Sequence, residues 1–149
     1  KNVFKTEISL HHFPTSRKID PIYDSFVIED AMQSVFISTH GHSLTESANS
    51  RIESLPKVSL LITPFNHYIL PVFLGGVVSP GIDGVSQLMQ TIKPKYVVAT
   101  HDEDKEAKGL VSKFARVLQS PTKEELRKID FLKNRYLAIE NYEMMELDV

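Results

Sequence analysis

The sequence predicts a layered α/β domain with a mixed β-sheet and helices on one face. Two observations lead to this prediction. Residues 58–63 and 96–100 are nearly all apolar, which is typical of strands covered on both faces. Residues 83–92, which lie between them, are expected to form a helix. The chain has 149 residues, so residues 1–149 are expected to form one domain.

The first part of the chain is expected to contribute three strands. Residues 3–10 alternate imperfectly between apolar and polar side chains, which predicts the first strand. Residues 11–21 are polar and contain two prolines, which predicts a loop. Residues 25–29 and 34–39 are expected to form a strand pair joined by a short turn.

The middle of the chain is expected to hold a helix and a long loop. Ser43 is the expected N-cap of a helix over residues 44–55, with Glu46 three residues after the cap. Pro56 ends that helix. Residues 64–80 are expected to be irregular, and loops of this length in a compact domain are often functional.

The last third is expected to be helical and then extended. Residues 105–118 place apolar side chains on one face of a helix. Residues 120–124 begin a further helix, with proline in the favoured first position. Residues 135–139 and 142–147 are expected to form a final strand pair.

The composition excludes several classes of function. The formal net charge is -2, which argues against nucleic-acid binding driven by overall charge. The chain has no cysteine, so a metal would need His, Asp or Glu ligands. The longest largely apolar run, residues 68–78, is too short to span a membrane. A cytoplasmic protein that binds neither nucleic acid nor membrane is therefore expected.

The histidines are the main candidates for chemistry, because sites in layered α/β proteins cluster where strands end. No Gly-rich phosphate loop or nucleophile elbow is present. Five of the six histidines lie at expected strand ends, and the sixth lies in the long loop. They are His11 and His12, His40 and His42, His101, and the loop residue His67.

Each of these groups also has a plain structural explanation. His11 and His12 can belong to a polar loop, and adjacent residues of an extended chain point in opposite directions, so at most one is expected to bind a metal. His40 and His42 share a side of an extended segment. The segment after His101 can be a solvated acidic turn. Three such groups far apart in the sequence favour a metal site.

Four segments resemble parts of the metallo-β-lactamase superfamily. One of them, residues 58–63, resembles the strand whose end leads into an active-site loop. Residues 92–103, IKPKYVVATHDE, resemble the strand that ends in the family's last metal-ligand histidine. Residues 26–41 resemble the strand pair that ends in the bridging aspartate, with His40 at roughly that place. Residues 8–14 resemble the strand and turn that carry an earlier histidine ligand, either His11 or His12.

The chain also departs from that family. Its signature, His-x-His-x-Asp-His, is absent, and the bridging aspartate is replaced. The resemblance covers about residues 3–104 and implies only the second half of an αβ/βα sandwich. Residues 1–149 are then a half-domain. Helices cover one face of such a sheet, so a homo-oligomer or a missing N-terminal segment is expected to cover the other.

Two functions follow from the resemblance. The first is part of a metal-dependent hydrolase that acts on a small-molecule substrate through a metal-bound hydroxide, with zinc or another divalent transition metal. The alternative is a degenerate, non-catalytic module that serves in protein interaction. The resemblance implies metal ligands among His11, His12, His40 and His101, a substrate-facing His67, and a supporting shell of His42, Asp102 and Glu103.

Overall fold

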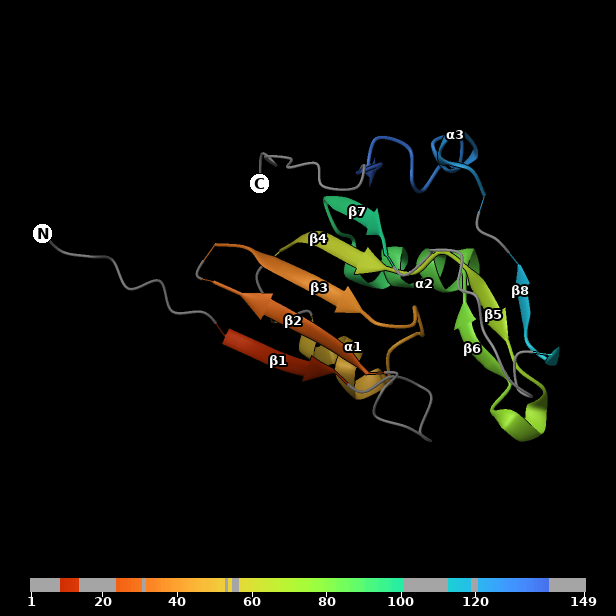
Figure 1. Cartoon of the computed structure of the whole chain (residues 1–149). Coiled ribbons are helices and arrows are strands. Elements are labelled where there is room, and N and C mark those ends of the chain that lie inside the picture. The colour runs from red at the N-terminus through yellow and green to blue at the C-terminus, as the bar shows by residue number, and fades with distance from the viewer. Residues whose placement is uncertain are drawn as a thin grey trace, which may run out of the picture.

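The computed structural model describes residues 9–13, 24–30, 32–52, 54, 57–100, 113–118 and 121–139. These residues form a mixed α/β structure with a six-stranded sheet, in the order β1-β2-β3-β4-β7-β9, and a three-stranded sheet, in the order β6-β5-β8 (Figure 1). The strands are β1 (Ser9–Phe13), β2 (Ser25–Glu29), β3 (Ser34–Ser38), β4 (Val58–Thr63), β5 (His67–Ile69), β6 (Val77–Pro80), β7 (Tyr96–Ala99), β8 (Arg116–Leu118) and β9 (Tyr136–Leu137). The helices are α1 (Glu46–Ile52), the 3-10 helix η2 (Val72–Leu74), α2 (Ile82–Ile92) and α3 (Lys123–Leu126).

The direction of the strands defines two edges of the six-stranded sheet. β2 is antiparallel to both β1 and β3, while β3, β4, β7 and β9 are parallel to one another. Five strands therefore have their C-terminal ends on the same side of the sheet: β1, β3, β4, β7 and β9. This row of strand ends is called here the carboxyl edge, and the row formed by their N-terminal ends is called the amino edge. The three-stranded sheet lies beyond the carboxyl edge (Figure 1).

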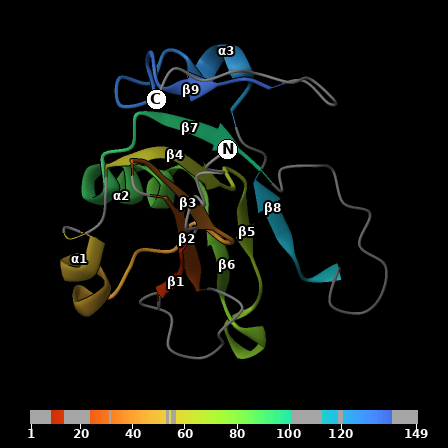
Figure 2. The ribbon, with the colours of Figure 1, turned by 90° about the vertical axis from the view of Figure 1, so that its left-hand side faces the viewer.

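One face of the six-stranded sheet, called here the core face, is covered by helices. α1 and α2 lie on the same side of the sheet (Figure 2). α2 buries an apolar stripe at helical spacing, so it packs flat on the strands. The paired strand residues that face it are fully buried: Phe13, Val27, Phe36, Leu61 and Val97.

The other face of the same strands, called here the open face, is equally apolar but less buried: within the described residues most of its side chains are half-buried, and Leu10 and Ile28 are exposed. Successive side chains of a strand alternate between the two faces. None of the apolar residues on the open face reaches the burial of its neighbours on the core face. They are Leu10, Phe26, Ile28, Val35, Ile37, Leu60, Ile62, Tyr96, Val98 and Leu137.

Several predicted elements are confirmed. The strands expected at 25–29, 34–39, 58–63 and 96–100 and the helix expected at 83–92 are present, with small changes of boundary. The turn between β2 and β3 is closed by Asp30, whose carboxylate accepts the backbone N–H groups of Met32 and Gln33 at 2.8 and 3.0 Å. These backbone hydrogen bonds hold the pKa of Asp30 below its usual value.

The prediction for the first strand was wrong at its end. β1 runs from Ser9 to Phe13, so His11 and His12 lie inside a strand and not in the loop that follows it. Antiparallel pairing with β2 continues to Phe13, opposite Ser25, and this long-range pairing decides where the strand ends. Residues 1–8 lie outside the described residues.

The long irregular stretch expected at 64–80 is instead a small antiparallel unit. β5 pairs with both β6 and β8, and η2 connects β5 to β6. Gly75 and Gly76 have φ values of +115° and +70°, which lets the chain reverse after η2. The prediction of one helix over 105–118 was also wrong at its end, because residues 116–118 form β8. Residues 105–112 lie outside the described residues.

The two short helices differ from expectation at their caps. Ser43 is not the cap of α1, because the Thr45 hydroxyl accepts the N–H of Ala48 at 3.3 Å. In α3 the cap is Thr122, one residue after Pro121, and it forms a capping box with Glu125. The hydrogen bonds from Thr122 hold the pKa of Glu125 below its usual value.

The strand expected over 135–139 is present in part as β9. β9 pairs in parallel with β7, and residues 142–147 lie outside the described residues. No helix within the described ranges is long and apolar enough to cross a membrane.

Candidate functional site

Two histidine-bearing segments extend from the carboxyl edge. His40 follows the end of β3 by two residues, and β7 leads through Thr100 to residue 101. The N–H of Thr100 donates to the carbonyl of Thr63 at 3.1 Å, which holds the chain beside the end of β4. β3 and β7 are thus parallel, flank β4 and end at the same edge. His101, Asp102 and Glu103 themselves lie outside the described residues.

His11 and His12 point to opposite faces of the sheet, as adjacent residues of a strand must. His11 is paired with Val27 on the core face. Its Nε2 lies 2.7 Å from Oε1 of Glu29, and the two side chains are 29% and 17% exposed. The two residues are diagonal neighbours across β1 and β2 and lie away from the carboxyl edge. This pair therefore fits a structural role within the sheet.

His12 lies on the open face, one residue from the carboxyl edge. Its Nε2 is 2.6 Å from Oδ2 of Asp24, and the side chains are 55% and 12% exposed. The hydroxyl of Thr39 donates to the backbone carbonyl of Asp24 at 3.1 Å. This bond joins the His12–Asp24 pair to the segment that carries His40.

The loop after β3 is fixed by short-range and long-range contacts. Gly41 has a φ of +72°, and its N–H donates to the hydroxyl of Ser38 at 3.0 Å. Nε2 of His42 donates to the carbonyl of Val78 at 2.8 Å, so this ring nitrogen carries the proton. His42 therefore ties the loop to β6.

The amino end of α2 packs directly against this loop. A Cβ on Gly84 would lie 2.1 Å from the carbonyl oxygen of Gly41 and 2.4 Å from Cγ of Pro80. Only glycine permits so close an approach between the helix and the loop. The position of His40 is therefore set by a tightly packed backbone on both sides.

His67 is the first residue of β5 and not part of an irregular loop. It follows the end of β4 by four residues and is half-buried. A Cβ on Gly81 would lie 3.0 Å from Cβ of His67, so the start of α2 also limits the space beside this histidine.

Buried hydroxyl groups lie beneath the carboxyl edge. Ser25 and Ser38 are paired across β2 and β3, Thr63 ends β4, and all three are fully buried. Among the described residues, Ser25 Oγ and Thr63 Oγ1 have no hydrogen-bond partner. Buried polar groups of this kind are normally satisfied by protein, water or ligand, so this edge retains unused hydrogen-bonding capacity.

The described donors fit a metal in chemical type but not in number. Imidazole and carboxylate groups suit zinc and related divalent ions. Within the described ranges, no group of three or more His, Asp or Glu side chains is placed to hold an ion. A catalytic zinc usually has three protein ligands, so a complete site needs residues beyond these ranges.

Sequence reasoning missed the carboxylate partners of the two histidines. Asp24 and Glu29 flank β2, and each reaches a histidine diagonally across the β1–β2 pair. Only the antiparallel register of β1 and β2 could have revealed these partners, and that register cannot be assigned before the end of β1 is known. Comparisons with protein-family models, with curated proteins and with solved structures find no match to this chain.

Proposed function

We propose that this chain is part of a metal-dependent hydrolase related to the metallo-β-lactamase superfamily, with its site at the carboxyl edge. The observation that supports the proposal best is the parallel arrangement of β3, β4 and β7. It brings the segments leading to His40 and His101 to the same edge, on either side of β4. Convergent histidines on a rigid sheet edge are what a metal site requires.

His12, and not His11, is the proposed ligand from β1. His12 is next to the carboxyl edge and more exposed, whereas His11 is held against Glu29 on the core face. Asp24 binds Nε2 of His12, which leaves Nδ1 as the ring nitrogen for an ion. A carboxylate on the second nitrogen of a ligand histidine fixes the orientation of the ring.

The remaining roles follow from position. His40 and His101 would complete the ligand set, and His42 would hold the loop that carries His40 through its bond to Val78. Asp102 and Glu103 would support His101. His67 would face a small-molecule substrate from the start of β5. When bound, zinc or a similar ion would polarise the scissile group and lower the pKa of a bound water to about 7.

The open face supports a second candidate, a non-catalytic interaction module. Its apolar side chains lie on the same strands as the fully buried core face but are themselves not buried. Large exposed apolar surfaces mark interaction sites in soluble proteins. In this alternative the histidines are remnants that hold no metal.

Metal titration separates the two candidates. Cobalt(II) added to the protein is expected to give ligand-field absorption bands that zinc removes. Replacing a ligand by alanine in His12→Ala, His40→Ala or His101→Ala should weaken binding by about tenfold or more, whereas His11→Ala should leave it unchanged. A spectrum without bands at millimolar cobalt, from a folded protein, would favour the interaction module.

A further inference from the structure

A second site lies at the amino edge of the six-stranded sheet, away from the histidines. A pocket of about 750 Å³ is formed where the chain enters β4, β7 and β9 and where α2 ends. Lys57 precedes β4, Lys95 precedes β7 and Arg135 precedes β9. Strands rise roughly 3.3 Å per residue, so the length of β4 separates this pocket from the carboxyl edge by about 20 Å.

The lining of this pocket is strongly basic. Among the described residues that line it, Asp130 is the only acidic one and five are basic, which gives these residues a formal charge of +4. The whole chain carries -2. Within the described residues, Lys57, Lys93 and Arg135 make no ion pair. The basic residues of the pocket are Lys57, Lys93, Lys95, Lys133 and Arg135.

A purely structural explanation accounts for only part of this charge. Lys93 is the C-cap of α2, where a cation complements the negative end of the helix dipole. That end is equivalent to about half a negative charge, so it does not balance five cations. Lys95 also lies 5.3 Å from the ring of Tyr96, which fixes one cation but leaves the others unexplained.

The backbone that carries these cations is held by hydrogen bonds. The N–H of Lys95 donates to Val58 at 3.1 Å, and that of Lys93 donates to Met89 at 3.1 Å. Arg135 is held on both sides, because its N–H donates to Leu132 at 2.9 Å and its carbonyl accepts from Val97 at 2.8 Å. The backbone positions from which these basic side chains extend are therefore fixed, and the side chains themselves are exposed and accessible to a ligand.

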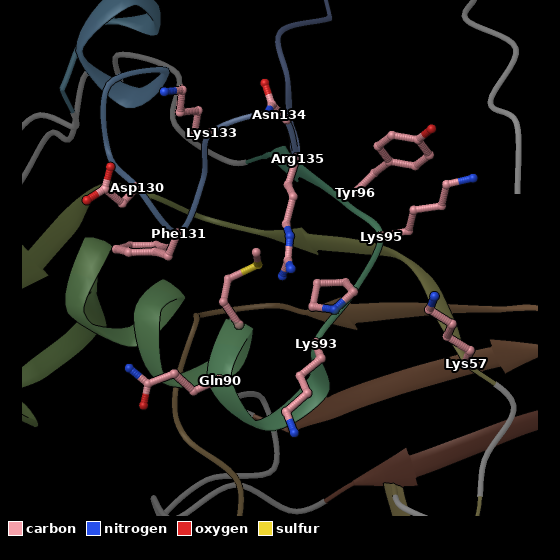
Figure 3. Close-up of a pocket in the computed structure, with 12 residues that line it drawn as sticks. Lys57, Gln90, Lys93, Lys95, Tyr96, Asp130, Phe131, Lys133, Asn134 and Arg135 are labelled. Carbon is pink, nitrogen blue, oxygen red and sulfur yellow. The ribbon is translucent and has the colours of Figure 1, made fainter.

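Figure 3 shows how the side chains are arranged. The guanidinium group of Arg135 reaches the middle of the pocket, with Lys93 below it and Lys57 to its right. The buried side chains of Met89 and Pro94 form an apolar floor. Gln90 and Asn134 at the rim add neutral hydrogen-bonding groups.

We propose that this pocket binds the pyrophosphate or polyphosphate group of a small soluble phosphate compound. Arg and Lys donors around one cavity are suited to phosphate oxygens, and a guanidinium can bind two of them at once. The volume matches a small-molecule site. The net negative charge of the chain argues against a long polyanion, because the residues outside the pocket carry a net negative charge.

Calorimetric titration with inorganic pyrophosphate at low salt tests the proposal. The double variant Lys57→Gln/Arg135→Gln should weaken binding by about tenfold or more, because charge-assisted hydrogen bonds are lost. The control Lys113→Gln/Arg116→Gln changes the net charge equally at exposed residues in or near β8, and should bind within about twofold of the unchanged chain. Lys93→Asn, which suits the left-handed backbone at φ +51°, provides a second variant if the double variant is unstable.

Further titrations define the ligand. A nucleoside diphosphate that binds as pyrophosphate does would show that the phosphates alone are recognised, and tighter binding would show contact with the rest of the nucleotide. The proposal is overturned if pyrophosphate at millimolar concentration does not bind the folded chain, or if the control loses as much affinity as the pocket variant. It is also overturned if a single-stranded oligonucleotide binds far more tightly than pyrophosphate through the same residues.

Discussion

The two neighbouring histidines of β1 show how one residue of difference changes a role. His11 and His12 have the same side chain and each pairs with a carboxylate. They differ in the face of the sheet and in exposure, and only His12 connects through Asp24 to the segment after β3. The sequence allowed at most one ligand here, and under the proposed function the strand register and the exposure favour His12.

Replacing Asp24 should weaken metal binding through His12. We expect Asp24→Asn to lower cobalt affinity by about 10- to 100-fold, because the ring of His12 loses the charged partner that orients it. The control is Glu29→Gln, which alters the partner of His11 and should leave the affinity unchanged. Nitrogen chemical shifts of the two rings check that each variant affects only its own histidine. Equal losses in both variants would contradict the assignment.

At the scale of elements, the contact between α2 and the loop after β3 leaves no room for a side chain at Gly84. Gly84→Ala should destabilise the fold by about 2–3 kcal/mol, because its Cβ would meet the backbone oxygen of Gly41 at 2.1 Å and that loop is held by Ser38 and His42. The free energy of unfolding in urea measures this cost.

Gly76→Ala is the matched control for that substitution. Gly76 has a positive φ, of +70°, unlike the helical Gly84, and nothing lies within 4 Å of its Cβ position. Only the backbone strain of about 1–2 kcal/mol should then appear. A smaller loss for Gly84→Ala than for Gly76→Ala would mean that the loop moves aside easily.

Buried parallel strands and the main helix could be predicted from the sequence, because their apolar runs reflect local burial. β4, β7 and α2 are found where expected. Elements whose limits depend on distant pairing could not be predicted. β8 carries apolar residues that suit a helix face, but its backbone pairs with β5. The candidate site is partly predictable for the same reason. The ends of the buried strands can be located in the sequence, whereas the partners Asp24 and Glu29 depend on the register between β1 and β2.

For the whole molecule, the main feature is the open face, whose apolar side chains are half-buried or exposed within the described residues. We expect the isolated chain to associate or to bind an apolar dye, because its open face would otherwise remain in water. Light scattering should give a mass above 16.9 kDa at micromolar concentration. A monomer that binds no dye would show that this face needs no partner. Under the proposed function, the isolated chain is also expected to be a poor hydrolase, because its sequence lacks the His-x-His-x-Asp-His signature that supplies further ligands in the metallo-β-lactamase superfamily.

Substitutions at two adjacent residues of β4 should distinguish the effect of the open face on association from the effect of the core on folding stability. Leu60 lies on the open face, whereas Leu61 is fully buried on the core face. Leu61→Ala should cost about 2–5 kcal/mol in the free energy of unfolding. Leu60→Ala should cost less and instead reduce dye binding or association. Equal destabilisation by the two substitutions would indicate that both faces are packed within one chain.

The parallel pairing of β4 between β3 and β7 has a consequence for how the chain folds. The antiparallel strands β1, β2 and β3 are consecutive in the chain, so they can assemble from near neighbours. β7 can join β4 only after residues 64–95 have been arranged, and closing such distant contacts is slow. During that interval the side of β4 that later pairs with β7 offers unpaired backbone groups to other chains. Aggregation during refolding should therefore depend on the rate at which β7 docks.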